Sequence, residues 1–159
     1  MMHRGELHKD HKIALVIPAF QLSAQCESFD EACRDLHSSM LPDTKAELVS
    51  MYREQSLEPV ISQFDSATNF HGHGSTRYAD WCTQKEDELL PIDCLTSKDR
   101  YEPYLVLRYC QELPPFQEAF TGYGQNKITW VQQVLRSGWK LHQVGGSFLV
   151  HVPHPKSSE

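Results

Sequence analysis

The last ten residues of the sequence include two histidines and a lysine that could bind a metal and a phosphate. His151 and His154 follow an apolar run that starts at Ser147, and Lys156 comes two residues later. Side chains mounted at the end of a buried strand have a rigid base, so these groups could serve a divalent metal and a phosphate together. The alternative is a polar C-terminal tail with no ligand.

A carboxylate occupies a second position suited to chemistry. Glu102 lies between Tyr101 and Pro103-Tyr104, and Pro103 forces it towards extended backbone at the entrance to a predicted strand over 104–107. A carboxylate held among aromatic rings can be desolvated and raised in pKa, as a general base requires. It can equally pair with a nearby arginine, and both interpretations stay open.

A glycine-rich loop leads into a predicted helix. Gly122 and Gly124 flank Tyr123, and the segment 128–135 that follows has apolar residues at helical spacing. The glycines let the backbone turn tightly, and a helix N-terminus offers free N–H groups to an anionic or hydroxyl-rich ligand. The alternative is a connection that binds nothing.

A second histidine pair lies in a Gly- and Ser-containing stretch. His71 and His73 are alternate residues of a predicted extended loop, which would place them on one face and is compatible with metal binding. Solvated or hydrogen-bonded loop histidines are the alternative. A small metal-dependent hydrolase would need this pair to meet His151 and His154, and no activating carboxylate lies near either pair in the sequence.

Length and composition restrict the function classes. The 159 residues suit one domain, and a net charge of -6 without a dense Lys/Arg stripe argues against a nucleic-acid binder. Five cysteines without a CxxC pair signal neither a zinc ribbon nor a closed disulfide framework, although one or two disulfides with a thiol left over remain open. Residues 1–11 are polar, and no apolar run reaches the ~20 residues that a membrane span needs. We expect no spanning segment or secretion signal in this chain.

Periodicity predicts a mixed α/β domain over 12–157. We expect strands over 12–20, 104–107, 139–144 and 147–152, the first and last of them buried, and helices from residue 44 and over 128–137. The segment 21–41 should form a short helix or a loop, and 84–100 a surface connection. Ser75 or Thr76 could cap a short turn that carries Tyr78 and Trp81.

Taken together, these motifs resemble the LARGE-type glucuronyltransferases, glycosyltransferase family 49. The order and spacing agree over about residues 12–157. The matching residues are Val16 to Phe20, Lys45 to Leu48, Gly72 and His73 with Thr76, Tyr78 and Trp81, Glu102 to Tyr104, Gly122 to Lys127, and His151 to Ser157.

The resemblance implies a GT-A-type fold with a mixed sheet and flanking helices, a nucleotide-sugar donor, Mn²⁺, and inverting transfer of glucuronic acid to a glycan in the Golgi lumen. It implies His151 as the metal ligand, with His154 as competitor, and leaves Glu102 as the candidate base. A lysine that approaches the diphosphate would offset its negative charge. The implied substrate-binding residues are His73, Trp81, Tyr104, Gly122, Tyr123, Gly124, Asn126, Lys127 and Lys156.

The chain also departs from the family pattern. It contains no Asp-x-Asp motif, and the match begins after the donor-binding half. Asn126 and Lys127 occupy places where some other inverting enzymes carry the carboxylate that acts as catalytic base, and neither deprotonates a sugar hydroxyl readily at neutral pH. We therefore expect an acceptor-side half, possessing weak or no activity by itself. The alternative is a non-catalytic carbohydrate-binding module or pseudoenzyme.

Overall fold

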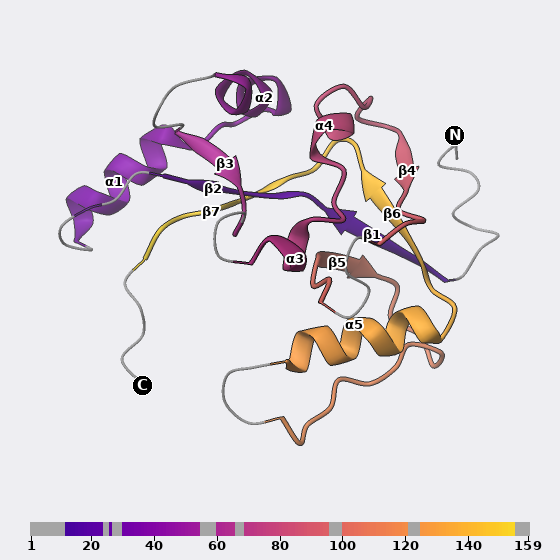
Figure 1. Ribbon diagram of the computed structural model, residues 1–159. Helices are drawn as coiled ribbons and strands as arrows, with labels where there is room; N and C mark the ends of the chain where they lie inside the picture. Colours follow the sequence, from indigo (N-terminus) through magenta and orange to yellow (C-terminus); the bar gives the residue numbers. More distant parts are fainter. Residues whose placement is uncertain are drawn as a thin grey trace. The chain divides into compact units, whose positions relative to one another are not determined.

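The computed structural model describes residues 12–23, 26, 30–54, 60–65, 69–95, 100–120 and 125–154. The chain divides into two compact units (Figure 1). The first unit comprises residues 1–18 and 65–147, and the second comprises 19–64 and 148–159. Each unit contains its own sheet, so the protein is a mixed α/β structure with two mixed sheets and flanking helices.

The first unit is built on a four-stranded sheet in the order β4-β6-β1-β5. Strand β1 (Ile13–Ile17) runs parallel to β6 (Lys140–Val144) and antiparallel to β5 (Tyr104–Leu107), while β4 (Leu89–Pro91) pairs antiparallel with β6. Because β1 is paired along both edges, it is an inner strand of the sheet, where a continuous apolar run is expected. This confirms a buried first strand over 13–17, but the single strand predicted over 12–20 is wrong, because the chain divides at Pro18 and residues 19–22 form a strand of the other sheet.

Helix α5 (Asn126–Arg136) packs against the core of the first unit, to which it contributes the buried Val134. Each fully buried apolar side chain contributes roughly 1.5–3 kcal/mol relative to an exposed one. Gly138, at φ +86°, follows the helix in the left-handed conformation expected for this terminal glycine. The buried core residues are Ala14, Val16, Ile92, Tyr101, Val134, Trp139 and Leu141.

The second unit contains a three-stranded sheet, β3-β2-β7, and two helices. Strand β2 (Ala19–Leu22) pairs antiparallel with β3 (Ile61–Gln63) and parallel with β7 (Leu149–His151). The helices are α1 (Glu31–Met40) and α2 (Lys45–Arg53). Both are close to their predicted positions.

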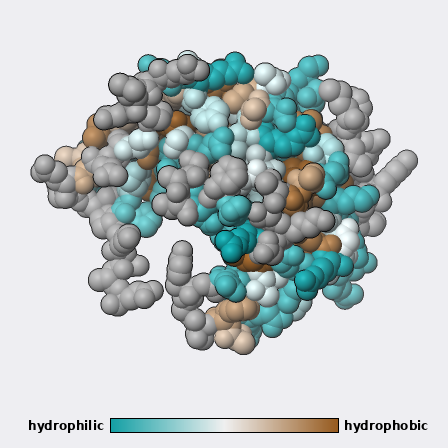
Figure 2. Space-filling model, in the orientation of Figure 1, coloured by the Kyte–Doolittle hydropathy of each residue, from teal (hydrophilic) through white to brown (hydrophobic). Residues whose placement is uncertain are grey.

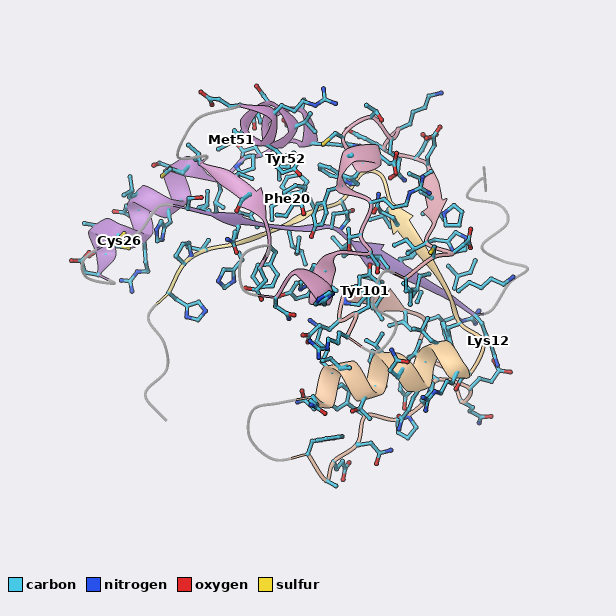
Figure 3. All side chains as sticks on the ribbon, viewed as in Figure 1. Lys12, Phe20, Cys26, Met51, Tyr52 and Tyr101 are labelled. Atoms are coloured by element: carbon cyan, nitrogen blue, oxygen red, sulfur yellow. A yellow bond between two sulfur atoms is a disulfide. The ribbon has the colours of Figure 1, made fainter. Side chains whose placement is uncertain are left out.

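Local contacts explain how the second unit is assembled. Thr44 and Glu47 form a capping box at the start of α2. Phe20 of β2 meets the Tyr52 ring edge-on, with ring centroids 5.4 Å apart (Figure 3), and Gln63 donates a 2.7 Å hydrogen bond to the Tyr52 hydroxyl. These contacts tie α2 to the sheet.

Two short helices of the first unit, α3 (Phe70–His73) and α4 (Tyr78–Trp81), precede β4. The fully buried Gln143 of β6 holds the start of α4, because its side-chain oxygen accepts from the Arg77 N–H at 2.8 Å and its amide donates to the Arg77 carbonyl at 3.2 Å. The same amide donates to the Gln84 side chain at 3.2 Å. Buried amides satisfied in this way fix α4 against the sheet.

Four local expectations are corrected. The segment 84–100 contains the edge strand β4, which three residues ending in proline did not signal. The last strand, β7, is three residues long and partly exposed rather than buried, since it lies at a sheet edge. Arg77, not Ser75 or Thr76, is the N-cap of α4. His71 and His73 lie in the helix α3, not in an extended loop.

Exposed large apolar side chains are scattered among polar ones. The face drawn in Figure 2 is mainly hydrophilic where it is coloured, and apolar colour occurs there in small areas. In the part of the chain that the structure describes, no helix combines the length and the apolar character needed to cross a membrane.

Candidate functional site

Five side chains of the first unit form what we call the Glu102 cluster: Asn69, His73, Glu102, Tyr104 and Lys127. They come from the residue before α3, from α3 itself, from the entrance to β5, from its first residue, and from the first turn of α5. Folding therefore brings together four residues that the sequence analysis had assigned to catalysis or substrate binding, over a span of more than fifty positions.

Glu102 is held from both its backbone and its side chain. Its N–H donates to the Gly72 carbonyl at 2.9 Å, and its carboxylate accepts from the Asn69 side-chain amide at 2.9 Å. The Asn69 side-chain oxygen in turn accepts from the Gly72 N–H at 3.2 Å. A side chain at Gly72 would bring its Cβ to 2.5 Å from the Asn69 amide nitrogen, so this close approach requires glycine.

Tyr104 presents its ring to two other members of the cluster. The His73 ring stacks on it at a centroid distance of 5.8 Å and an interplanar angle of 25°. The Lys127 ammonium lies 4.5 Å from the ring centroid, in cation–π geometry. The half-buried Tyr104 is thus positioned by a neutral ring and a cation.

Burial and nearby charges set the protonation of the cluster. Burial, reinforced by the charge of Lys127 and opposed by Asp65, lowers the pKa of His73 to about 4. His73 is therefore neutral at neutral pH. Burial also lowers the pKa of Lys127, against the opposing pull of Glu102 and Asp65. Burial, followed by the negative charges of Asp65 and Glu102, raises the pKa of Tyr104.

The backbone beside the cluster adopts a rare conformation twice. Asp65 and Gln125, at φ 54° and 55°, are the two non-glycine residues with positive φ among those the structure describes. Asp65 acts electrostatically on three cluster members, and Gln125 precedes α5 two positions before Lys127. Such conformations cost of order 1–3 kcal/mol and concentrate at functional sites.

Buried residues of the first unit include Tyr101, which directly precedes Glu102 in the sequence. The Tyr101 hydroxyl lies 2.9 Å from the Thr76 hydroxyl, and burial raises the pKa of Tyr101 well above its usual range. Trp81 is fully buried in the same unit. Its predicted contact with a sugar stays a prediction. The side chain has no exposed surface in this structure.

The predicted metal ligands His151 and His154 belong to the second unit. Their rings lie 5.3 Å apart, and His151 also packs against Phe64 at 5.0 Å. Within the described residues, the one group of three potential ligands close enough to share a metal is Cys26, Cys33 and His37, so this pair is not part of such a group.

The remaining predicted site residues differ in what the structure says of them. Asn126 is the first residue of α5, and its side-chain oxygen accepts from the Lys127 N–H at 2.8 Å. Gly122, Tyr123, Gly124 and Lys156 lie outside the described residues. His71 is exposed while His73 is buried, because a helix turns neighbouring side chains away from each other, and the expectation of one shared face is wrong.

Comparison with known proteins gives the family of this chain. The chain belongs to the protein family described as glycosyl-transferase for dystroglycan, whose pattern matches residues 1–157. The resemblance inferred from the motifs is thereby confirmed.

Individual relatives are distant. The chain is 29% identical over 151 residues to a xylosyl- and glucuronyltransferase LARGE2s from Gallus gallus, covering 92% of this chain and 17% of that protein. It is 28% identical over 152 residues to the glycosyltransferase-like protein gnt14 of Dictyostelium discoideum, covering 95% and 20%. It is 28% identical over 139 residues to the mouse beta-1,4-glucuronyltransferase 1, covering 87% and 29%. The chain thus spans less than a third of the length of these relatives.

Proposed function

We propose that this chain provides the acceptor-side part of a GT-A-type glycosyltransferase that transfers glucuronic acid from UDP-glucuronate to a sugar hydroxyl in the Golgi lumen. The observation that carries the proposal is the Glu102 cluster, in which a carboxylate, an aromatic ring and a lysine lie together. Family membership and the names of the relatives support the donor and the reaction class.

Each member of the cluster has a part in this proposal. The carboxylate of Glu102 accepts the proton of the attacking acceptor hydroxyl, because a carboxylate with one oxygen bonded to Asn69 keeps further acceptor capacity. The partly exposed side chain of Tyr104 offers an aromatic contact to a sugar ring. Lys127 offers its ammonium to a hydroxyl or to negative charge that develops on the leaving group.

The proposed Mn²⁺ fits the donor chemistry of His151 and His154, since imidazole nitrogen binds first-row divalent ions and these two rings lie side by side. When bound, the ion would offset the negative charge of the nucleoside diphosphate. His151 would hold the ion and His154 would be its competitor for that role.

The proposal is tested by separating sugar binding from transfer. We would titrate UDP-glucuronate and a xylose-terminated disaccharide by calorimetry, and follow transfer between them with Mn²⁺ present. The disaccharide is chosen because relatives are named for xylosyl and glucuronyl transfer. Glu102→Gln should lower transfer by roughly 10²–10⁴-fold, since it removes general-base catalysis, while disaccharide affinity changes little.

Two matched controls make the result specific. Glu112→Gln changes an exposed carboxylate and should leave transfer unaltered. Tyr104→Ala should abolish disaccharide binding, whereas Tyr109→Ala, at a tyrosine that is 93% exposed, should not. Transfer at the wild-type rate by Glu102→Gln would contradict the assignment of the base. Mn²⁺ affinity that is the same for the wild-type chain and for His151→Ala would support the non-catalytic carbohydrate-binding alternative, which lacks the metal site.

A further inference from the structure

A second cluster of reactive side chains lies in the second unit, and the proposed transferase chemistry does not use it. Helix α1 begins after Asp30, whose side chain accepts a 3.0 Å hydrogen bond from the Cys33 N–H. Cys33 and His37 are one helical turn apart, so they share a face of α1. Both are almost fully buried, at 4% and 3% exposure.

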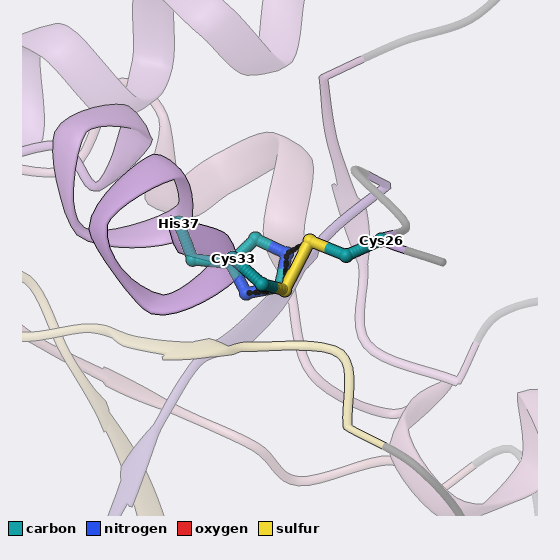
Figure 4. A group of neighbouring side chains, drawn as sticks. All are labelled: Cys26, Cys33 and His37. Atoms are coloured by element: carbon teal, nitrogen blue, oxygen red, sulfur yellow. Dashed lines mark hydrogen bonds between the residues drawn. A yellow bond between two sulfur atoms is a disulfide. The ribbon is translucent and has the colours of Figure 1, made fainter. Parts of the chain in front are cut away.

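Cys26 completes the cluster from the chain before α1. It forms a disulfide with Cys33, and the His37 ring packs against both sulfurs (Figure 4). His37 Nε2 is 3.6 Å from Cys26 Sγ, and His37 Nδ1 is 3.8 Å from Cys33 Sγ. The sequence analysis left disulfides open but did not single out this histidine.

The sulfur–nitrogen distances match those of a metal site. In a tetrahedral zinc site with Zn–S of about 2.3 Å and Zn–N of about 2.0 Å, sulfur and nitrogen ligands lie about 3.5 Å apart. One imidazole nitrogen binds one ion, and His37 Nε2 lies 3.6 Å from Cys26 Sγ and 4.0 Å from Cys33 Sγ. Both separations are within about 0.5 Å of this value. Two thiolates in such a site lie about 3.8 Å apart, so the sulfurs must separate from their bonded distance.

We propose that the Cys26–Cys33 disulfide and a three-ligand zinc site are alternative states of one cluster. In the dithiol state, Cys26, Cys33 and His37 bind Zn²⁺ through two thiolates and one imidazole, and the fourth position takes water or another ligand. In the disulfide state the cluster cannot bind the ion, because a disulfide sulfur is not a thiolate.

The change between the states requires a dithiol reductant. Its thiolate attacks Cys26 Sγ, the more exposed sulfur, and forms a mixed disulfide while Cys33 leaves as a thiolate beside His37. The second thiol of the reductant then attacks the mixed disulfide and releases Cys26, so two electrons pass to the protein and the reductant leaves as a disulfide. Binding of Zn²⁺ displaces the two thiol protons.

Only one of the three ligands has to move when the disulfide opens. Cys33 and His37 are fixed by the helix, whereas Cys26 is partly exposed and lies outside α1. Opening the disulfide therefore moves Cys26 and leaves the other two ligands in place. Because Cys33 and His37 are already in position, forming the metal site requires ordering of one ligand instead of three, which lowers its free-energy cost.

The test uses Co²⁺ as a spectroscopic substitute for Zn²⁺ on the unmodified chain, before and after reduction by a phosphine that is then removed. Cys82, Cys94 and Cys110 are free thiols in both states, so the difference spectrum reports on Cys26 and Cys33. We expect thiolate-to-cobalt charge transfer and tetrahedral d–d absorption in the reduced chain only, at one ion per chain, with displacement by Zn²⁺. Cobalt absorption of equal intensity in both states would overturn the proposal.

A histidine variant tests the third ligand. His37→Asn should weaken Co²⁺ binding of the reduced chain by at least tenfold, while His71→Asn, at an exposed histidine of the first unit, should leave it unchanged. Cys26→Ser, which removes the partly exposed ligand, should have the same effect as His37→Asn without opening a buried cavity. Circular dichroism checks that each variant is folded. Equal cobalt affinity in Cys26→Ser and the reduced wild-type chain would exclude the site.

Discussion

The neutral, buried His73 makes the stability of the protein depend on pH in a defined direction. Its pKa in the folded chain is about 4, below the 6.5 of an ordinary histidine, chiefly because of burial. Well above pH 6.5 the residue is neutral in both states and contributes no pH dependence. Between pH 6.5 and 4 the unfolded chain binds a proton that the folded chain does not, so the free energy of unfolding falls as pH falls.

The size of this effect follows from the two pKa values. Because the unfolded chain binds more protons, the free energy of unfolding falls by about 2 kcal/mol between pH 7 and pH 5. The slope approaches 1.36 kcal/mol for each pH unit at pH values well below the unfolded pKa. His73 is 5% exposed, so solvent screening reduces the effect little. This loss is a large fraction of the stability of an ordinary domain.

The assay is urea unfolding at pH 7 and at pH 5, followed by circular dichroism, for three proteins. His73→Gln removes the titrating group and should lose about 2 kcal/mol less than wild type between the two pH values. Loss of the stack on Tyr104 destabilises this variant at both pH values, so the comparison rests on the pH-dependent difference. His71→Gln, at the exposed histidine two residues away, should behave as wild type. Equal losses in wild type and His73→Gln would refute the reasoning.

Two further substitutions probe the geometry of the cluster and of the second unit. Gly72→Ala places a Cβ against the Asn69 amide and should push it away from Glu102, lowering the free energy of unfolding by about 1–2 kcal/mol in urea titrations; an unchanged value would show that the amide is not held there. Thr44→Ala removes the side-chain half of the capping box and should cost about 1 kcal/mol, whereas Thr44→Ser should restore most of it; equal stability of the two variants would argue against the cap.

The elements with strong periodicity were predictable from the sequence. The strands predicted over 12–20 and 139–144 contain β1 and β6, and the helix predicted over 128–137 overlaps most of α5; each of these elements buries a matching face. Strand β4 was missed because three residues ending in proline show no period, and its pairing with β6 comes from tertiary contact. The segment around His73 was expected to be extended because glycine and serine suggested a loop, yet it forms a helical turn.

The candidate site was only partly predictable. Glu102, Tyr104 and Lys127 carry chemistry that residue type and motif reveal, and the fold brings them together. Asn69 and Asp65 were not predicted, because their parts depend on a side-chain hydrogen bond and on a left-handed backbone conformation that no local pattern specifies. The position of Cys26 against His37 likewise arises only when the chain folds back on α1.

Pro18 joins inner strands of two different sheets, and this affects how the chain folds while it is being synthesised. Strands β1 and β2 leave the tunnel more than 120 residues before their parallel neighbours β6 and β7 are made. Both early strands must therefore wait with one side unpaired, which is slow to resolve and invites association with other nascent chains. Synthesis halted before Lys140 would leave neither sheet complete.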